Sequence, residues 1–289
     1  MTTAIHARAL LVSLSISTWS ARRYDRKVTD KVNSEYAASR DAGRYNKHLL
    51  PGDNPAYKAL VSLAGAIRHR HHDLTLPWSD ENWRLLPTAQ YMDYTTWYRE
   101  QSRAFATAVD AFRAEYPVAR ANAERLLGAM YRDEDYPAIG DLDRRFLLSV
   151  NYMPVPAAGD IRVDLASDQI ADIEASIRAR VDDATRTAMQ TAWKRLHDTV
   201  AHVAERLGSP DAIFRDTLIA HVHDTCDLLS RLNVTDDPDL ERLRARTAYT
   251  LANLHPDDLR DDPIQRQSAA TAAEYILQQM RDVYGEVAA

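Results

Sequence analysis

The 289-residue sequence holds only eight glycines and a single cysteine, Cys226, and each shortage excludes a class of protein. One cysteine cannot form an intramolecular disulfide, so a disulfide-stabilised fold is excluded and a reducing compartment is expected. Few glycines leave little material for phosphate-binding loops, and no Gly-x-x-x-x-Gly-Lys, Gly-x-Gly-x-x-Gly or Gly-x-Ser-x-Gly motif is found. The sequence therefore carries no signature of a nucleotide-binding loop or of a serine hydrolase.

Long hydrophobic runs are missing as well. The apolar stretch near the N-terminus, residues 9–16, is interrupted by serines and is too short for a signal-peptide core or a membrane span. Together with the lone cysteine, this predicts a soluble, cytoplasmic protein. Abundant alanine, leucine, arginine and acidic residues favour helices over strands.

The sequence does contain an amphipathic run from about Asp168 to Leu207 that has neither glycine nor proline. Its apolar residues recur every three or four positions, which is the spacing of one helix face. A helix of about 40 residues extends about 60 Å. With a second helix over residues 212–232 folded back on it, the run predicts a long antiparallel helical hairpin.

The other segments predict a mainly α, elongated protein with a small sheet of about three strands. Alternating or β-branched patterns predict strands at residues 10–16, 146–153 and 161–165. Residues 74–92 are expected to form an irregular apolar loop packed on the body. Helices are predicted at about residues 21–50, 54–73, 93–116, 118–130, 240–254 and 263–287, with Pro117 either kinking a helix or starting the next. We expect an α-rich body over residues 1–165 and the hairpin with the C-terminal helices over 166–289, or one continuous domain.

Charge is distributed unevenly along the chain. The formal net charge is −6, which argues against a general nucleic-acid coat protein. Residues 1–75 nevertheless carry a net charge of +6, which leaves −12 on the remainder. This asymmetry fits a nucleic-acid surface, an acidic partner, or a basic segment packed against the acidic part of the same fold.

The basic segment interleaves arginine and lysine with aromatic side chains, as surfaces that bind single-stranded nucleic acid do. A solvated helix face with ion pairs such as Arg26–Asp30, or a surface for a protein partner, fits the same pattern. The candidate partner or nucleic-acid surface consists of Trp19, Arg22, Arg23, Tyr24, Arg26, Lys27, Lys31, Arg40, Arg44 and Lys47.

Metal-binding residue types occur, but their spacing does not favour a metal site. His69, His72 and Asp73 would share one helix face, yet neighbouring arginines oppose a bound cation. The histidines and cysteine between residues 221 and 226 are scattered around a helix, and adjacent aspartate pairs fit helix capping. No catalytic residue, metal or cofactor is predicted.

Three groups of motifs are found together: Leu11–Trp19 followed by Arg22–Lys27, Leu74–Trp78 with Arg84–Pro87, and Val155–Pro156 before Asp160–Val163. Through them the chain, over roughly residues 10–254, resembles a family of uncharacterised proteins from phages and bacteria. That family is often encoded near MoxR-like AAA+ ATPases and cobaltochelatase-like proteins with a von Willebrand A domain. The resemblance implies an accessory role in a phage or mobile-element ATPase system and carries no catalytic residues.

We therefore expect a non-enzymatic adaptor or regulatory subunit that binds a protein partner, such as an AAA+ ATPase, and that can form homo-oligomers. This hypothesis predicts apolar residues along 168–207 that the chain itself does not cover. The alternative is a phage nucleic-acid-binding protein that uses the basic aromatic N-terminal segment.

Overall fold

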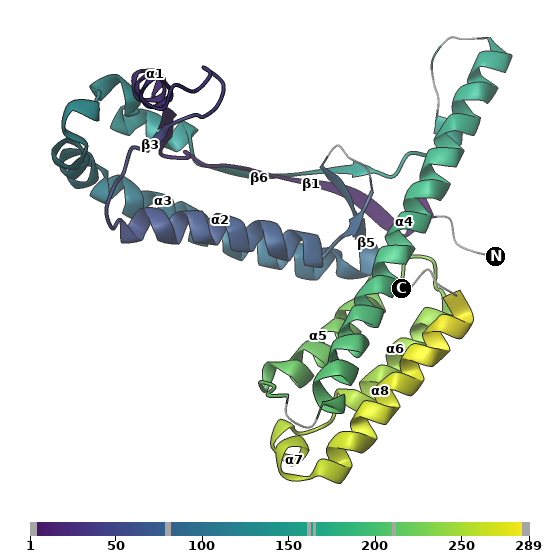
Figure 1. The fold of residues 1–289 in the computed structure, drawn as a ribbon. Helices are drawn as coiled ribbons and strands as arrows, with labels where there is room; N and C mark the ends of the chain where they lie inside the picture. The colour runs from purple at the N-terminus through teal and green to yellow at the C-terminus, as the bar shows by residue number, and fades with distance from the viewer. Residues whose placement is uncertain (1–4, 79–81, 161–162, 164–165, 210–211, 285–289) are drawn as a thin grey trace. The chain divides into compact units, whose positions relative to one another are not determined.

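A computed structural model describes residues 5–78, 82–160, 163, 166–209 and 212–284 (Figure 1). The protein is 69% helical with a four-stranded and a two-stranded sheet, which confirms the predicted mainly α class. The helices are α1 (Arg26–Glu35), α2 (Pro55–Asp73), α3 (Tyr91–Leu127), α4 (Ser167–Gly208), α5 (Thr217–Leu232), α6 (Pro238–Leu251), α7 (Pro256–Asp261) and α8 (Pro263–Tyr284). The strands are β1 (Ala9–Ser17), β2 (Arg22–Tyr24), β3 (Asn46–His48), β4 (Leu76–Pro77), β5 (Trp83–Pro87) and β6 (Leu147–Pro154).

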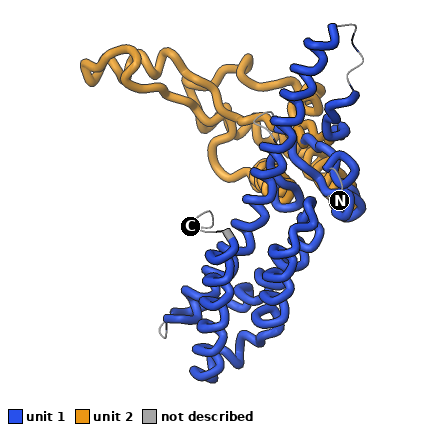
Figure 2. The backbone as a smooth tube through the Cα atoms, turned by 90° about the vertical axis from the view of Figure 1, so that its right-hand side faces the viewer, with its two compact units in different colours: residues 1–13, 72–95, 151–289 blue, residues 14–71, 96–150 orange. Residues whose placement is uncertain are grey.

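The chain divides into two compact units, each built from separated segments (Figure 2). Unit 1 comprises residues 1–13, 72–95 and 151–289, and unit 2 comprises residues 14–71 and 96–150. These boundaries differ from a division at residue 165, because the first strand and the segment around β4 and β5 pack with the C-terminal helices. By sequence, unit 2 has 19 Lys and Arg against 14 Asp and Glu, whereas unit 1 has 17 against 28. Unit 2 is therefore formally +5 and unit 1 formally −11.

In unit 1, the C-terminal half of α4 packs with α5, α6 and α8 in a helical bundle (Figure 1). The predicted long helix is confirmed, and α5 folds back on it as expected. Buried leucine, valine, isoleucine and alanine side chains fill the space between these helices. Such an apolar core supplies most of the stability of helices in a bundle.

The larger sheet has the strand order β4-β5-β1-β6. Strands β1 and β5 are antiparallel, with Leu11 opposite Leu85 and Ser13 opposite Trp83. The strands predicted at residues 10–16 and 146–153 are confirmed, whereas the one at 161–165 lies outside the described residues except for position 163. The predicted irregular loop at 74–92 is wrong over β4 and β5. Strand β5 lies between two neighbours and is buried on both faces, so its apolar residues do not alternate.

In unit 2, the helix predicted over residues 21–50 is wrong for most of that range. The Asp25 carboxylate accepts a hydrogen bond from the Val28 backbone N–H at 3.1 Å and so caps a helix that starts only at Arg26. That helix ends at Glu35, and Ala37 has a φ of 49°, a left-handed conformation that a helix cannot include. The flanking residues instead form the antiparallel β2–β3 ribbon.

Helix α3 runs without interruption through Pro117, so the alternative in which a separate helix starts after this proline is wrong. Proline lacks a backbone N–H and costs about 3 kcal/mol relative to alanine inside a helix. Pro117 is exposed, so its replacement leaves no cavity. We expect Pro117→Ala to raise the free energy of unfolding by about 1–3 kcal/mol, measured by urea denaturation of the full chain. A lower stability would show that α3 depends on the geometry that proline imposes.

Candidate functional site

Helix α4 carries one continuous apolar stripe, but only its C-terminal part is fully buried by the described residues. Buried side chains begin at Ala184 and continue to Leu207, where α5 and α8 pack on the helix. The preceding turns continue the stripe through Ile170, Ile173 and Ile177, none of which is buried, and Ile173 is 38% exposed. Within the described residues the stripe is therefore partly exposed on the N-terminal part of α4 and buried on its C-terminal part.

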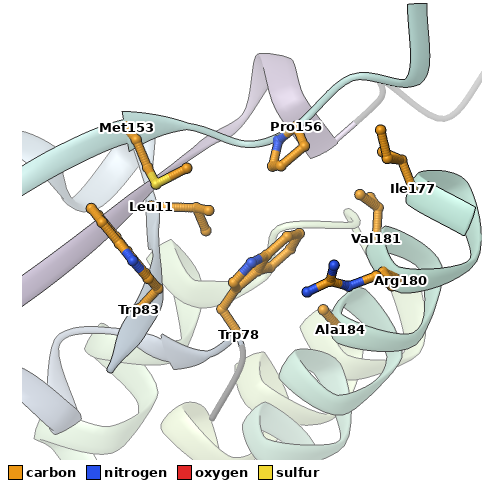
Figure 3. Close-up of a pocket in the computed structure, with 9 residues that line it drawn as sticks. All are labelled: Leu11, Trp78, Trp83, Met153, Pro156, Ile177, Arg180, Val181 and Ala184. Carbon is orange, nitrogen blue, oxygen red and sulfur yellow. The ribbon is translucent and has the colours of Figure 1, made fainter. Parts of the chain in front are cut away.

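At the boundary between the buried and the partly exposed parts of the stripe, the surface of unit 1 is hollowed into a pocket of about 200 Å³ (Figure 3). Helix α4 forms one wall and the sheet with its flanking segments forms the other. The lining residues are Leu11, Trp78, Trp83, Met153, Pro156, Ile177, Arg180, Val181 and Ala184. In Figure 3, the Trp78 ring extends toward α4, whereas the Trp83 ring lies on the far side of the space, near Met153 and Leu11.

The sheet register explains why these side chains meet. Because Ser13 pairs with Trp83 and Leu11 pairs with Leu85, Leu11 and Trp83 lie on the same face of the sheet. Pro156 follows shortly after β6, and Trp78 follows directly after β4. Three segments that are far apart in the sequence therefore supply one apolar wall.

Two arginines hold the segment that leads to Trp78. The Arg195 guanidinium of α4 donates hydrogen bonds to the backbone carbonyls of His72, Asp73 and Thr75 at 2.7–3.0 Å. Arg84 Nε donates to the Thr75 hydroxyl at 2.6 Å. Burial lowers the pKa of Arg84 to about 10, and Arg84 therefore stays charged at neutral pH. Arginine side chains at the C-terminal carbonyls of α2 also stabilise the end of that helix.

The size and chemistry of the pocket favour an inserted side chain over a cofactor. Pockets that bind small molecules usually measure about 300–1,000 Å³, whereas this one measures about 200 Å³. Among its nine lining residues Arg180 is the single ionisable one, so the lining offers no acid–base pair. An apolar side chain accompanied by a carboxylate near Arg180 would complement it.

The structure places two residues of the predicted basic aromatic surface in the core of unit 2, which corrects that part of the prediction. Trp19 is buried among Tyr57, Phe112, Tyr116 and Tyr136, with ring centroids 6.0–6.5 Å from its own. An indole ring surrounded by four aromatic rings cannot stack on a base.

Lys47 is the second residue, with a side chain that is only 2% exposed. Its Nζ lies 2.6 Å from Asp135 Oδ2 and 3.7 Å from Asp25 Oδ2, and it donates to the Met130 carbonyl at 2.7 Å. The hydrogen bond from the Val28 N–H, together with the attraction of Lys47, lowers the pKa of Asp25 despite its burial. This buried charge network holds the β2–β3 ribbon on unit 2.

The other eight residues of the predicted surface are exposed: Arg22, Arg23, Tyr24, Arg26, Lys27, Lys31, Arg40 and Arg44. They do not all lie on the same face. Arg23 Nε is 3.4 Å from Asp135, so Arg23 faces the same side of the ribbon as Lys47. Arg26 pairs with Asp30 at 3.6 Å, as the alternative interpretation of a solvated helix face expects.

Side chains alternate between the two faces of the β2–β3 ribbon, so the residues next to Arg23 and Lys47 point to the face that is opposite Asp135. Arg22 pairs with His48 and Tyr24 with Asn46 in the register of β2 and β3, so these four side chains share one face. The guanidinium of Arg44 lies 6.0 Å from the centroid of the Tyr24 ring. We call these five exposed residues, Arg22, Tyr24, Arg44, Asn46 and His48, the ribbon face.

Other residue types that the sequence suggested for chemistry do not converge. Within the described ranges no three His, Cys, Asp or Glu side chains are grouped as a metal ion would need, and this holds for His69, His72 and Asp73 too. Cys226 is buried, and burial raises the pKa of its thiol to about 11. None of the helices within the described ranges is long and apolar enough to span a membrane.

The chain matches no family model, and neither a curated protein nor a solved structure matches it.

Proposed function

We propose that this chain is a non-enzymatic adaptor or regulatory subunit that binds a helix of a protein partner on the N-terminal part of α4. The observation that carries the proposal is the continuity of the α4 stripe. From Ala184 to Leu207 the stripe is buried under helices of the same chain, and from Ile170 to Val181 the same spacing continues with side chains that the described part of the chain leaves half-buried or exposed. A surface that already packs helices along half its length fits a further helix on the other half.

The pocket supplies an anchor for that helix. Interfaces obtain most of their affinity from a few side chains that insert into desolvated pockets. An apolar side chain of the partner would enter between Trp78 and Val181, and a neighbouring aspartate or glutamate would pair with Arg180. The partner segment is therefore an amphipathic helix with an apolar anchor and an acidic residue close to it.

The resemblance to the phage and bacterial family gives the partner an expected identity, a MoxR-like AAA+ ATPase. On this proposal the chain is a cytoplasmic accessory protein of a phage or mobile-element ATPase system. Its role is to bind and position the ATPase or its target, and no covalent chemistry is assigned to it.

We expect Ile177→Asp to abolish partner capture, because it places a carboxylate on the stripe at the edge of the pocket. Loss of one buried isoleucine contact alone is worth about 1.5–3 kcal/mol, or roughly 10- to 100-fold in affinity. The tagged full-length chain is used to capture proteins from nuclease-treated lysate of its native host, read by mass spectrometry. The matched control is Ile264→Asp, since Ile264 is an 82% exposed isoleucine at the start of α8.

A MoxR-like ATPase that is retained by the wild type and Ile264→Asp and lost with Ile177→Asp would support the proposal in full. A different protein with the same dependence would support the docking site and reject the ATPase as partner. Equal capture by all three chains, or capture that requires nucleic acid, would reject the docking site.

A further inference from the structure

The ribbon face of unit 2 is a second surface, and the adaptor proposal does not use it. Its five residues comprise two arginines, one tyrosine, one asparagine and one histidine, so it contains hydrogen-bond donors, an aromatic ring and no carboxylate. Tyr24 is 46% exposed, although large aromatic side chains are usually buried in cores or interfaces. We infer that the ribbon face binds single-stranded nucleic acid, with Tyr24 stacking on a base and Arg22 and Arg44 contacting phosphates.

The ribbon is held rigidly from the side opposite this face. Arg23 and Lys47, which are paired in the register, both reach Asp135, and the Tyr45 hydroxyl lies 3.9 Å from Met130 Sδ. The backbone N–H of Tyr45, which directly precedes β3, donates to the Thr29 hydroxyl at 3.0 Å. Because one side is fixed to unit 2, the residues on the other side are presented to solvent in a defined arrangement. A rigid platform lowers the entropy lost on binding.

Charge around the ribbon face favours an anion. Across residues 22–48 the exposed charged residues comprise seven Lys and Arg and three Asp and Glu. Unit 2 as a whole is formally +5 in a chain whose net charge is −6. Lys27 and Lys31 are exposed one helical turn apart on α1 and extend the basic surface beyond the ribbon.

The aromatic ring distinguishes nucleic acid from a merely acidic partner. A base stacks on an exposed tyrosine in a sequence-tolerant way, and single strands are bound by such stacking combined with phosphate contacts. The Arg44 guanidinium lies over one face of the Tyr24 ring, which places a phosphate-binding group near the ring and leaves the other face for a base to stack on. A duplex keeps its bases paired and stacked, so it cannot use Tyr24 in this way.

The test measures binding of full-length protein to fluorescently labelled 12-nucleotide oligo-dT and oligo-U by anisotropy at several salt concentrations. We expect Tyr24→Leu to weaken binding about 10-fold and Tyr24→Phe to bind like the wild type, since phenylalanine keeps the stacking surface. Replacing Arg22 and Arg44 together with glutamine is expected to make the slope of log K against log salt less negative by about 1.4, because each phosphate contact contributes about 0.7. Tyr36→Leu and Lys58→Gln, which change exposed residues of unit 2 outside the ribbon face, are the matched controls.

Each alternative result overturns the inference. A duplex that binds as tightly as the single strands, or polyglutamate that competes as well as oligo-dT, would show a charge-only surface. Equal affinity of the wild type and Tyr24→Leu would exclude stacking. No binding at low salt would exclude nucleic acid as a ligand. Unchanged circular dichroism and melting temperature of the variants would show that any loss arises at the exposed face.

Discussion

Replacing Lys47 with methionine is expected to lower the free energy of unfolding by about 3–5 kcal/mol, because it removes one partner from a buried ion pair. The side chains of Asp135 and Asp25 are 6% and 7% exposed, and both lie next to the Lys47 ammonium. Without that ammonium, the carboxylates remain in a poorly hydrated site with less compensation. The loss is measured in the full chain by native-state hydrogen exchange of the β2–β3 ribbon and of residues 96–127 of α3.

Two variants make the Lys47 experiment specific. Lys58→Met removes a lysine that is 68% exposed and pairs with Asp53 at the surface, so its effect should stay within about 0.5 kcal/mol. Adding Asp135→Asn to Lys47→Met should recover part of the loss, since a neutral amide replaces an uncompensated carboxylate. A Lys47→Met effect no larger than that of Lys58→Met would contradict the buried network.

Truncation of Leu196 to alanine is expected to destabilise the helical bundle by about 2–5 kcal/mol. Leu196 lies on the covered part of α4, and its side chain has no exposed surface. Deletion of its branched end removes apolar contacts and leaves a cavity in the core of unit 1. Urea denaturation followed by circular dichroism at 222 nm reports this loss in the full chain.

Conservative and surface substitutions test whether packing causes that effect. Leu196→Met keeps most of the side-chain volume and should cost less than about 1.5 kcal/mol. Ile264→Ala truncates an exposed residue of the same unit and should change stability by less than about 0.5 kcal/mol. If Leu196→Ala were as mild as Ile264→Ala, the bundle core described above would be wrong.

The long helix was predictable because its signal is local and repeated. Residues 168–207 contain neither glycine nor proline, and the apolar spacing is consistent over many turns, so errors at single positions average out. The adaptor hypothesis predicted exposed apolar residues along 168–207, and among the described residues the exposed or half-buried part of the stripe lies before Ala184. Sequence spacing shows which residues share a face and does not show where a covering helix ends.

The pocket was not predictable, because its walls come from segments that meet only in the folded chain. Trp78 and Trp83 belong to the segment 74–92 that the sequence predicted to pack on the body, yet their neighbours in the pocket include Leu11 and Val181, far away in the sequence. The continuous apolar run of β5 also gave no alternation from which a strand could be recognised. The sequence does not reveal the register between β1 and β5, which places Leu11 and Trp83 on the same face of the sheet.

The burial of Lys47 was not predicted from the sequence, for a different reason. Lysine is almost always exposed, so its place on a basic surface was the natural prediction. Its partner Asp135 is 88 positions away in the sequence, and nothing local signals the pair. The ribbon that contains Lys47 is equally short of local signal, since each strand has three residues and the preceding helix ends through the left-handed Ala37.

The partly exposed N-terminal part of α4 is central to the proposed function, as the docking surface for a helix of a partner protein. The most direct test replaces Ile177 with a photo-cross-linking amino acid and irradiates nuclease-treated lysate of the native host, with the same substitution at Ile264 as control. We expect one cross-linked protein that is specific to position 177, whose site of attachment lies in an amphipathic helix beside an acidic residue. Identical products at both positions, or products at neither, would contradict the proposal.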